Sequence, residues 1–115
     1  MERFYVDPVK SADITEVQTT LLVNDQLIPL NDFTQRYLGS IMRGIVQALG
    51  QESQEIKLYM DEGLRLYTEA GEVPLYKDFS KIIIESTIKG VLSPLKGIFW
   101  FGRVSIYCKY VKGKN

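Results

Sequence analysis

The sequence contains no histidine and only one cysteine, Cys108, among its 115 residues. Without histidine the chain lacks the usual general base, the hydrolase triads built on it and the commonest metal ligand. A single cysteine cannot form an intramolecular disulfide, and it cannot build a zinc or iron–sulfur site. The sequence also has no Walker loop and no Gly-x-Gly-x-x-Gly motif. We therefore expect no catalytic constellation, no cofactor and no metal, and we interpret the chain as a binding domain rather than an enzyme.

The charges of the chain cancel, because 14 lysines and arginines balance 14 aspartates and glutamates. A zero net charge disfavours non-specific nucleic-acid binding, which depends on excess cations that neutralise phosphates. It also leaves little repulsion between copies, which permits self-association. The longest apolar run, residues 97–102, is far shorter than the roughly 20 residues of a membrane span. With no apparent signal peptide and a single cysteine, the sequence predicts a cytoplasmic protein.

One segment of the chain occurs twice. Residues 27–33 (Leu-Ile-Pro-Leu-Asn-Asp-Phe) are matched by residues 72–79 (Glu-Val-Pro-Leu-Tyr-Lys-Asp-Phe), which contain one extra residue. After this insertion the two copies stay in step, 46 residues apart. The identical pairs are Asp32/Asp78, Phe33/Phe79, Ser40/Ser86, Gly44/Gly90 and Leu49/Leu95. We interpret the match as an internal duplication, which makes residues 1–115 a single domain of two repeats, about 16–60 and 64–111.

Each repeat is predicted to hold strands around one helix. Alternating and β-branched side chains predict strands over residues 16–23, 55–60, 64–68 and 103–111. Residues 24–25 have the composition of a turn, and residues 61–63 that of a hairpin loop with Gly63 at a positive φ. Apolar residues at helical spacing predict helices over 31–49 and from Asp78 to about Ser93. Asn31 or Asp32 suits the first N-cap, and Gly50 suits the stop.

The apolar spacing in the two helices also predicts which side faces the core. In the first helix the predicted stripe consists of Phe33, Tyr37, Ile41, Ile45, Ala48 and Leu49, widened by Leu38 and Met42. A glycine within a helix costs about 1 kcal/mol relative to alanine. Because Gly44 and Gly90 occupy the same place in both copies, we expect the helices to pack closely against each other, or on the sheet, at these glycines.

The element order β-α-β, β-α-β predicts an α+β two-layer sandwich with a ferredoxin-like fold. Right-handed crossovers would place four antiparallel strands in the order 4-1-3-2, with both helices on one face. In an alternative interpretation, the arms at residues 26–30 and 72–75 are strands. The chain would then hold β-β-α-β twice, with a more curved or split sheet.

One face of such a sheet carries no helix, and its outward side chains form the first candidate interface. They include tyrosines interleaved with cations: Lys57, Tyr59, Arg65, Tyr67, Tyr107 and Lys109. The predicted hairpin register sets Tyr59 opposite Arg65 and Lys57 opposite Tyr67. Tyrosine and arginine are enriched at protein interfaces, and the same residue types bind single-stranded nucleic acid. Ordinary cross-strand pairs on a solvated face are the plain alternative.

A second candidate contact is an aromatic segment that occurs only in the second copy. Phe99, Trp100 and Phe101 lie between Gly97 and Gly102. We expect an oligomer contact here, or a lid over the core. The leading hypothesis is thus a homo-oligomer, or a domain that binds another protein, through the sheet face or the Phe99–Phe101 loop. A single-stranded nucleic-acid module using the sheet face is the alternative.

Residues 23–33 (Val-Asn-Asp-Gln-Leu-Ile-Pro-Leu-Asn-Asp-Phe), together with Gly44-Ile45-Val46 and Leu49, resemble a pattern in small uncharacterised prokaryotic proteins. That pattern reads Val-Asn-Gly-x-x-Ile-Pro-Leu-Asn-x-Phe, followed by a helix with Gly-Met-Val and leucine. The chain departs from it at Asp25, where the pattern has glycine, and at Tyr76-Lys77 in the second copy. The resemblance covers about 30 residues. It implies an old half-domain, doubled here, and it supplies no function.

Overall fold

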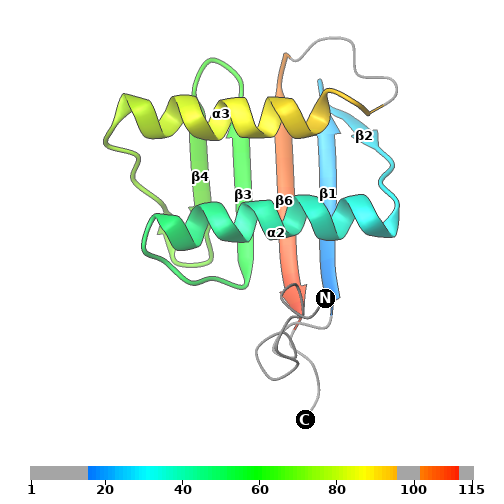
Figure 1. Ribbon diagram of the computed structural model, residues 1–115, viewed down its shortest axis with the longest axis horizontal. Helices are drawn as coiled ribbons and strands as arrows, with labels where there is room; N and C mark the ends of the chain where they lie inside the picture. The colour runs from blue at the N-terminus through cyan, green and yellow to red at the C-terminus, as the bar shows by residue number, and fades with distance from the viewer. Residues whose placement is uncertain (1–15, 96–101, 112–115) are drawn as a thin grey trace, which may run out of the picture.

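The computed structural model describes residues 16–95 and 102–111 as one antiparallel sheet with two helices on one of its faces (Figure 1). The strands are β1 (Glu16–Val23), β2 (Gln26–Ile28), β3 (Glu55–Met60), β4 (Leu64–Thr68), β5 (Gly71–Glu72) and β6 (Val104–Val111). The helices are α2 (Asp32–Ala48) and α3 (Asp78–Leu92). The α+β class is confirmed. The predicted Phe99–Phe101 contact lies outside the described residues.

The predicted ferredoxin-like strand order is wrong. The sheet order is β2-β1-β6-β3-β4-β5, so its four long strands read 1-4-2-3 in chain order instead of 4-1-3-2. β6 pairs with both β1 and β3 and occupies the centre. Its inward side chains Val104, Ile106, Cys108 and Tyr110 are all buried, as a central strand requires.

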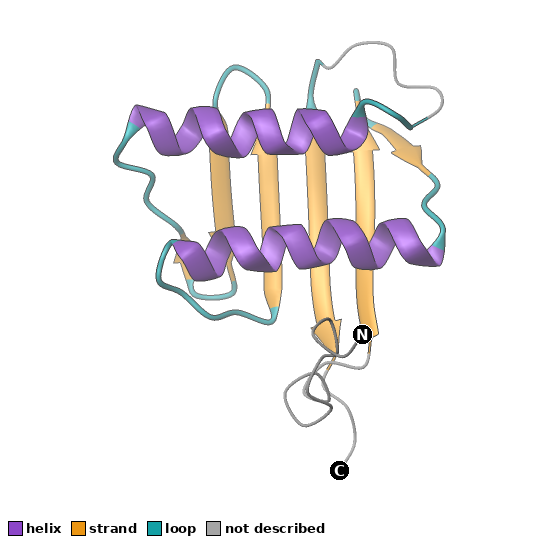
Figure 2. Ribbon diagram, in the orientation of Figure 1, coloured by secondary structure: helices purple, strands orange, loops and turns teal. Residues whose placement is uncertain are grey.

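The arms before the helices are strands in part. β2 and β5 precede α2 and α3, so the chain runs β-β-α-β twice. When each strand of the first β-β-α-β unit is exchanged with the corresponding strand of the second, the strand order is the same read from the opposite edge of the sheet. The midpoint of this symmetry lies between β6 and β3. Both helices lie across the strands and run in opposite directions (Figure 2). Duplication itself stays an interpretation of the sequence.

The predicted turn at residues 24–25 joins β1 to β2 and also holds β6. Asn24 and Asp25 have φ values of 52° and 67°, which a tight hairpin turn of this kind requires at both central positions. The Asn24 backbone donates to the Arg103 carbonyl at 2.7 Å, and its side chain accepts from the Arg103 N–H at 2.9 Å. Arg103 also forms an ion pair with Asp25. The turn therefore fixes the beginning of the central strand.

The two helices begin differently although their sequences match. The Asn31 side chain accepts a hydrogen bond from the Thr34 N–H at 2.7 Å and caps α2. Lys77, at the equivalent position of α3, makes no side-chain cap. Gly50 follows α2 with φ +88°, the left-handed geometry that favours glycine. The predicted ends of both helices are confirmed to within a residue or two.

The buried side of α2 is rotated away from the centre of the predicted stripe, which contained two of its four buried residues, Leu38 and Met42. The buried residues of α2 are Leu38, Gly39, Met42 and Val46, and those of α3 are Ile84, Ile88 and Leu92. Phe33 and Tyr37 are exposed and stack on each other with ring centroids 5.5 Å apart. Apolar residues occupy two sides of α2, so periodicity alone did not decide between them.

The glycine prediction is also wrong. A Cβ added at Gly44 or Gly90 would meet no atom within 4 Å, and both residues are exposed. The close approach occurs instead at Gly39, where a Cβ would lie 2.3 Å from Val17 Cγ1 and 3.2 Å from Thr19 Oγ1. The Tyr110 hydroxyl donates to the Gly39 carbonyl, and Thr19 Oγ1 donates to the Gln35 carbonyl at 2.8 Å. Gly39 is thus where α2 docks on β1 and β6.

Candidate functional site

The open face of the sheet carries the predicted tyrosines and cations. Tyr59 pairs with Arg65 and Lys57 with Tyr67, as the hairpin register predicted. The pairing extends across the sheet in two rows. The first row is Leu27, Leu22, Ser105, Tyr59 and Arg65, and the second is Thr20, Tyr107, Lys57, Tyr67 and Glu72. Residues from the N-terminal and C-terminal parts of the chain therefore form one continuous surface.

Three tyrosines form the centre of this surface, and we call them the tyrosine cluster: Tyr59, Tyr67 and Tyr107. The Tyr59 ring meets Tyr67 edge to face at 5.7 Å between centroids, and it meets Tyr107 in the same way at 5.9 Å. All three are half-buried by these contacts. Hydrogen bonding to Tyr107, with burial and neighbouring charges, raises the pKa of Tyr59 to about 12. Tyr59 therefore stays neutral through the physiological pH range.

Two cations lie against the cluster. Lys57 Nζ is 6.0 Å from the centre of the Tyr107 ring, and the Arg65 guanidinium is 5.8 Å from the centre of the Tyr59 ring. Both distances are at the outer limit for a cation–π contact. The cations have exposed side chains, so their charges remain available to a ligand.

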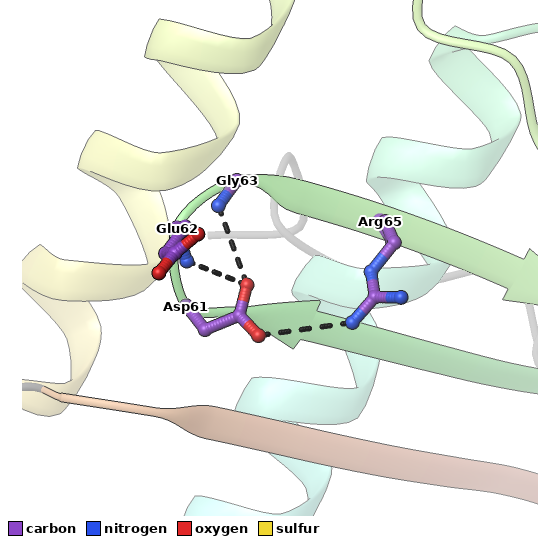
Figure 3. A network of polar contacts seen from close by, with 4 residues as sticks. All are labelled: Asp61, Glu62, Gly63 and Arg65. Carbon is purple, nitrogen blue, oxygen red and sulfur yellow. Dashed lines mark hydrogen bonds and ion pairs between the residues drawn. The ribbon is translucent and has the colours of Figure 1, made fainter.

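The β3–β4 hairpin loop sets the position of Arg65 (Figure 3). The Asp61 carboxylate accepts from the backbone N–H groups of Glu62 at 2.6 Å and Gly63 at 3.3 Å, and it lies 3.7 Å from Arg65 Nη2. Asp61 thus stabilises the loop, as the sequence interpretation of Asp61-Glu62 as turn formers predicted. The expected positive φ of Gly63 is wrong, because the Asp61 carboxylate rather than a left-handed glycine closes this loop.

The charge of the open face is mixed. Lys109 pairs across the strands with Glu55, and Tyr67 pairs with Glu72. Two shallow hollows lie on this face, one lined by Lys57, Tyr59, Arg65, Tyr67 and Thr68 and the other mainly by Gln18, Thr20, Glu55, Lys57, Tyr107 and Lys109. The face offers aromatic edges and isolated cations rather than a continuous cationic groove.

A group of exposed apolar residues lies elsewhere, on the helices, and the sequence prediction placed two of them, Phe33 and Tyr37, in the stripe that faces the core. Phe33 and Phe79 are 66% and 69% exposed, and Tyr37 and Ile83 are 51% and 47% exposed. These are equivalent positions of the two repeats. Ile82 is 60% exposed beside them. We call these five residues the helix-layer patch. It has two parts, Phe33 with Tyr37 on α2 and Phe79 with Ile82 and Ile83 on α3, which lie toward opposite ends of the layer because the helices are antiparallel. Centring the helical pattern on Leu38, Met42 and Val46 instead of on Phe33 would have predicted it.

Cys108 carries the one thiol of the chain and is buried on the inner side of β6. Burial raises the pKa of this thiol to about 11, although a contact with Thr19 Oγ1 at 3.7 Å acts in the opposite direction. A protonated, inaccessible thiol is not a nucleophile. Within residues 16–95 and 102–111, no three histidine, cysteine, aspartate or glutamate residues gather in a way that could hold a metal ion.

In the same described part of the chain, neither helix is long and apolar enough to cross a membrane. Comparison of the chain with protein-family models, with curated proteins and with solved structures found no match.

Proposed function

We propose that this protein is a self-associating domain and that its helix layer forms the contact between two copies. The observation that supports this proposal is the helix-layer patch, in which the equivalent residues of both repeats are exposed. Selection for solubility favours polar side chains at such positions. The sheet side of each helix already carries enough apolar residues for the core, and the patch residues are not part of the core that residues 16–95 and 102–111 form.

The area of the patch approaches what a stable interface needs. A large apolar side chain presents about 150–250 Å² when fully exposed. The exposed parts of the five residues then amount to roughly 590 Å² in total, taking about 200 Å² for each side chain. A stable interface buries about 800 Å² on each partner. Polar residues beside the patch, such as Arg36 and Ser86, would supply the remaining area.

The open sheet face is the weaker candidate for this contact. Its tyrosines are already half-buried against one another, so less apolar surface remains to be removed from water on association. Its exposed charges of both signs would also lose hydration. These two differences favour the helix layer over the sheet face that the sequence suggested.

The test is solution mass by light scattering across a range of protein concentrations. Phe33→Ser together with Phe79→Ser should convert the dimer into a folded monomer, because both side chains are exposed and contribute little to the core. The matched control, Tyr67→Ser, alters the sheet face and should leave the dimer intact. If only Tyr67→Ser abolished the dimer, the contact would lie on the sheet face instead of the helix layer. A wild-type protein that is monomeric at every concentration would refute the proposal.

The tyrosine cluster supports a second candidate function, the binding of single-stranded nucleic acid. Tyrosine rings flanked by Lys57, Arg65 and Lys109 provide stacking surfaces and phosphate contacts. An oligonucleotide titration at low and high salt tests it. Tyr59→Ala should weaken binding by roughly 1–3 kcal/mol if a base stacks there, whereas Phe79→Ser should not. Absence of binding at low salt would exclude this function.

A further inference from the structure

Among the described residues, Gly44 and Gly90 have no close packing contact that would require a glycine in the helix. Each lies inside a helix, where glycine is destabilising relative to alanine. Neither has a positive φ, and a Cβ at either position would meet nothing within 4 Å. Gly39, in contrast, is needed for the packing of α2 on β1. The two exposed glycines therefore leave open space on the outside of the helix layer.

Each glycine lies on the same side of its helix as the helix-layer patch. Gly44 follows Tyr37 by seven residues, and Gly90 follows Ile83 by seven. Seven residues are close to two turns of an α-helix, so each glycine is aligned with the exposed side chain before it. Both helices thus present bulky side chains in their N-terminal half and, on the same side, a residue without a side chain toward their C-terminal half.

Because α2 and α3 are antiparallel, the outer surface of the helix layer can fit against the same surface of a second copy. Figure 1 shows that the N-terminal half of α2 and the N-terminal half of α3 lie at opposite ends of the layer. Consider a second copy placed with its helix layer against that of the first, related by a twofold axis that lies between the two layers and parallel to them. Each helix of the second copy then lies antiparallel to the helix of the first copy that it contacts. The bulky half of every helix then faces the glycine half of the helix below it.

We infer that Gly44 and Gly90 are the points at which the helices of a second copy pack closest, with Tyr37 and Ile83 of that copy seated over them. This inference rests on the proposed self-association and specifies its geometry. Small residues at a helix crossing let the backbones approach, and bulky side chains over small ones give the interlocking packing of a stable interface. Another copy of this chain fits this surface because the bulky side chains and the glycines both lie on the outer side of the helix layer.

The experiment compares Gly90→Leu with Lys89→Leu by light scattering and sedimentation. The two positions are adjacent, yet they point about 100° apart around α3, and both are exposed. Gly90→Leu and Gly44→Leu should each weaken the dimer at least 100-fold, while their monomers unfold at the same or a higher temperature than wild type. Lys89→Leu should leave the dimerisation constant within threefold of wild type.

Smaller substitutions guard against a folding defect. Gly44→Ala and Gly90→Ala add a methyl group that finds open space in the monomer, and each should weaken the dimer by about tenfold without loss of stability. Tyr37→Ala with Ile83→Ala should restore part of the affinity lost in Gly90→Leu, since a shortened side chain makes room for the leucine.

The outcomes separate the inference from the function on which it rests. A wild-type dimer that is unaffected by all four glycine substitutions would overturn the inference and leave the proposed self-association standing. A wild-type monomer would overturn both. A dimer weakened as strongly by Lys89→Leu as by Gly90→Leu would show a general surface effect and would also overturn the inference.

Discussion

Three glycines within the two helices occupy different environments. Gly39 lies against Val17 and Thr19 of β1, whereas Gly44 and Gly90 face open space. The repeat drew attention to the matched pair and away from Gly39, which has no counterpart because Glu85 occupies the equivalent position. The distinguishing signal is spacing, since Gly39 precedes the buried Val46 by seven residues and therefore faces the sheet.

Gly39→Ala should destabilise the protein by about 1–3 kcal/mol, because the added methyl would overlap Val17 Cγ1 and force β1 and α2 apart. Gly44→Ala is the control and should stabilise the monomer by up to about 1 kcal/mol through helix propensity. Denaturant unfolding in dilute solution measures both changes. Equal effects of the two substitutions would contradict the packing assigned to Gly39.

Cys108 should be inert in the native protein. With a pKa of about 11, only about one thiol in a thousand is ionised at pH 8, and the side chain is 2% exposed. A thiol-specific reagent such as iodoacetamide should therefore modify the protein only when it unfolds. Mass spectrometry in the presence and absence of denaturant measures this, and rapid modification of the folded protein would contradict the burial of β6.

At the scale of elements, the capped and uncapped helices give a matched pair of predictions. Asn31→Ala removes the side chain that accepts from the Thr34 N–H and should cost about 0.5–2 kcal/mol of unfolding free energy. Lys77→Asn provides α3 with the cap it lacks and should stabilise by about 1 kcal/mol. Thermal unfolding followed by circular dichroism compares the two. A loss of stability in Lys77→Asn would show that the Lys77 side chain has a role of its own.

The limits of most elements and the register of one hairpin could be predicted from the sequence. β3 and β4 alternate cleanly around a short loop, so that Leu58 opposite Leu66 and Tyr59 opposite Arg65 follow from the pattern alone. The tyrosines and cations of the open sheet face were predicted for the same reason, because alternation along the strands assigns each side chain to one face. The helix faces were not, because α2 carries apolar residues on two sides and only contact with the sheet decides which of them is buried.

At the scale of the whole molecule, the strand order could not be predicted from local patterns. β1 and β6 are both eight residues long, and the sequence of neither strand indicates which strand lies beside it in the sheet. Placing β6 between β1 and β3 depends on contacts between residues far apart in the chain, such as Leu21 with Ile106 and Leu58 with Ile106. The short strands β2 and β5 then occupy the edges, where few hydrogen-bonding groups are left unpaired.

The stability of the folded protein should fall in alkaline solution. The pKa of Cys108 is raised from 9.0 to about 11, and burial also raises the pKa of Tyr110 above its usual value. Above pH 9 the unfolded chain releases the thiol proton while the folded protein retains it, so rising pH favours unfolding. The stability contributed by Cys108 is complete below pH 9 and is lost progressively toward pH 11.

Cys108→Ala isolates this contribution. The substitution should lower stability at neutral pH because it leaves a small cavity, but it should flatten the decline between pH 9 and 11. Urea unfolding at several pH values measures both effects. A decline of the same steepness in wild type and Cys108→Ala would assign the alkaline loss to the tyrosines alone.

The central place of β6 has a consequence for the order in which the protein is made. A nascent chain that has left the ribosome as far as residue 103 already contains seven of the eight described elements. It lacks the strand that joins β1 to β3, so β2-β1 and β3-β4-β5 remain two separate small sheets, each with an unpaired edge. The eight residues of β6 thus join the two small sheets into one, and folding during synthesis waits for them.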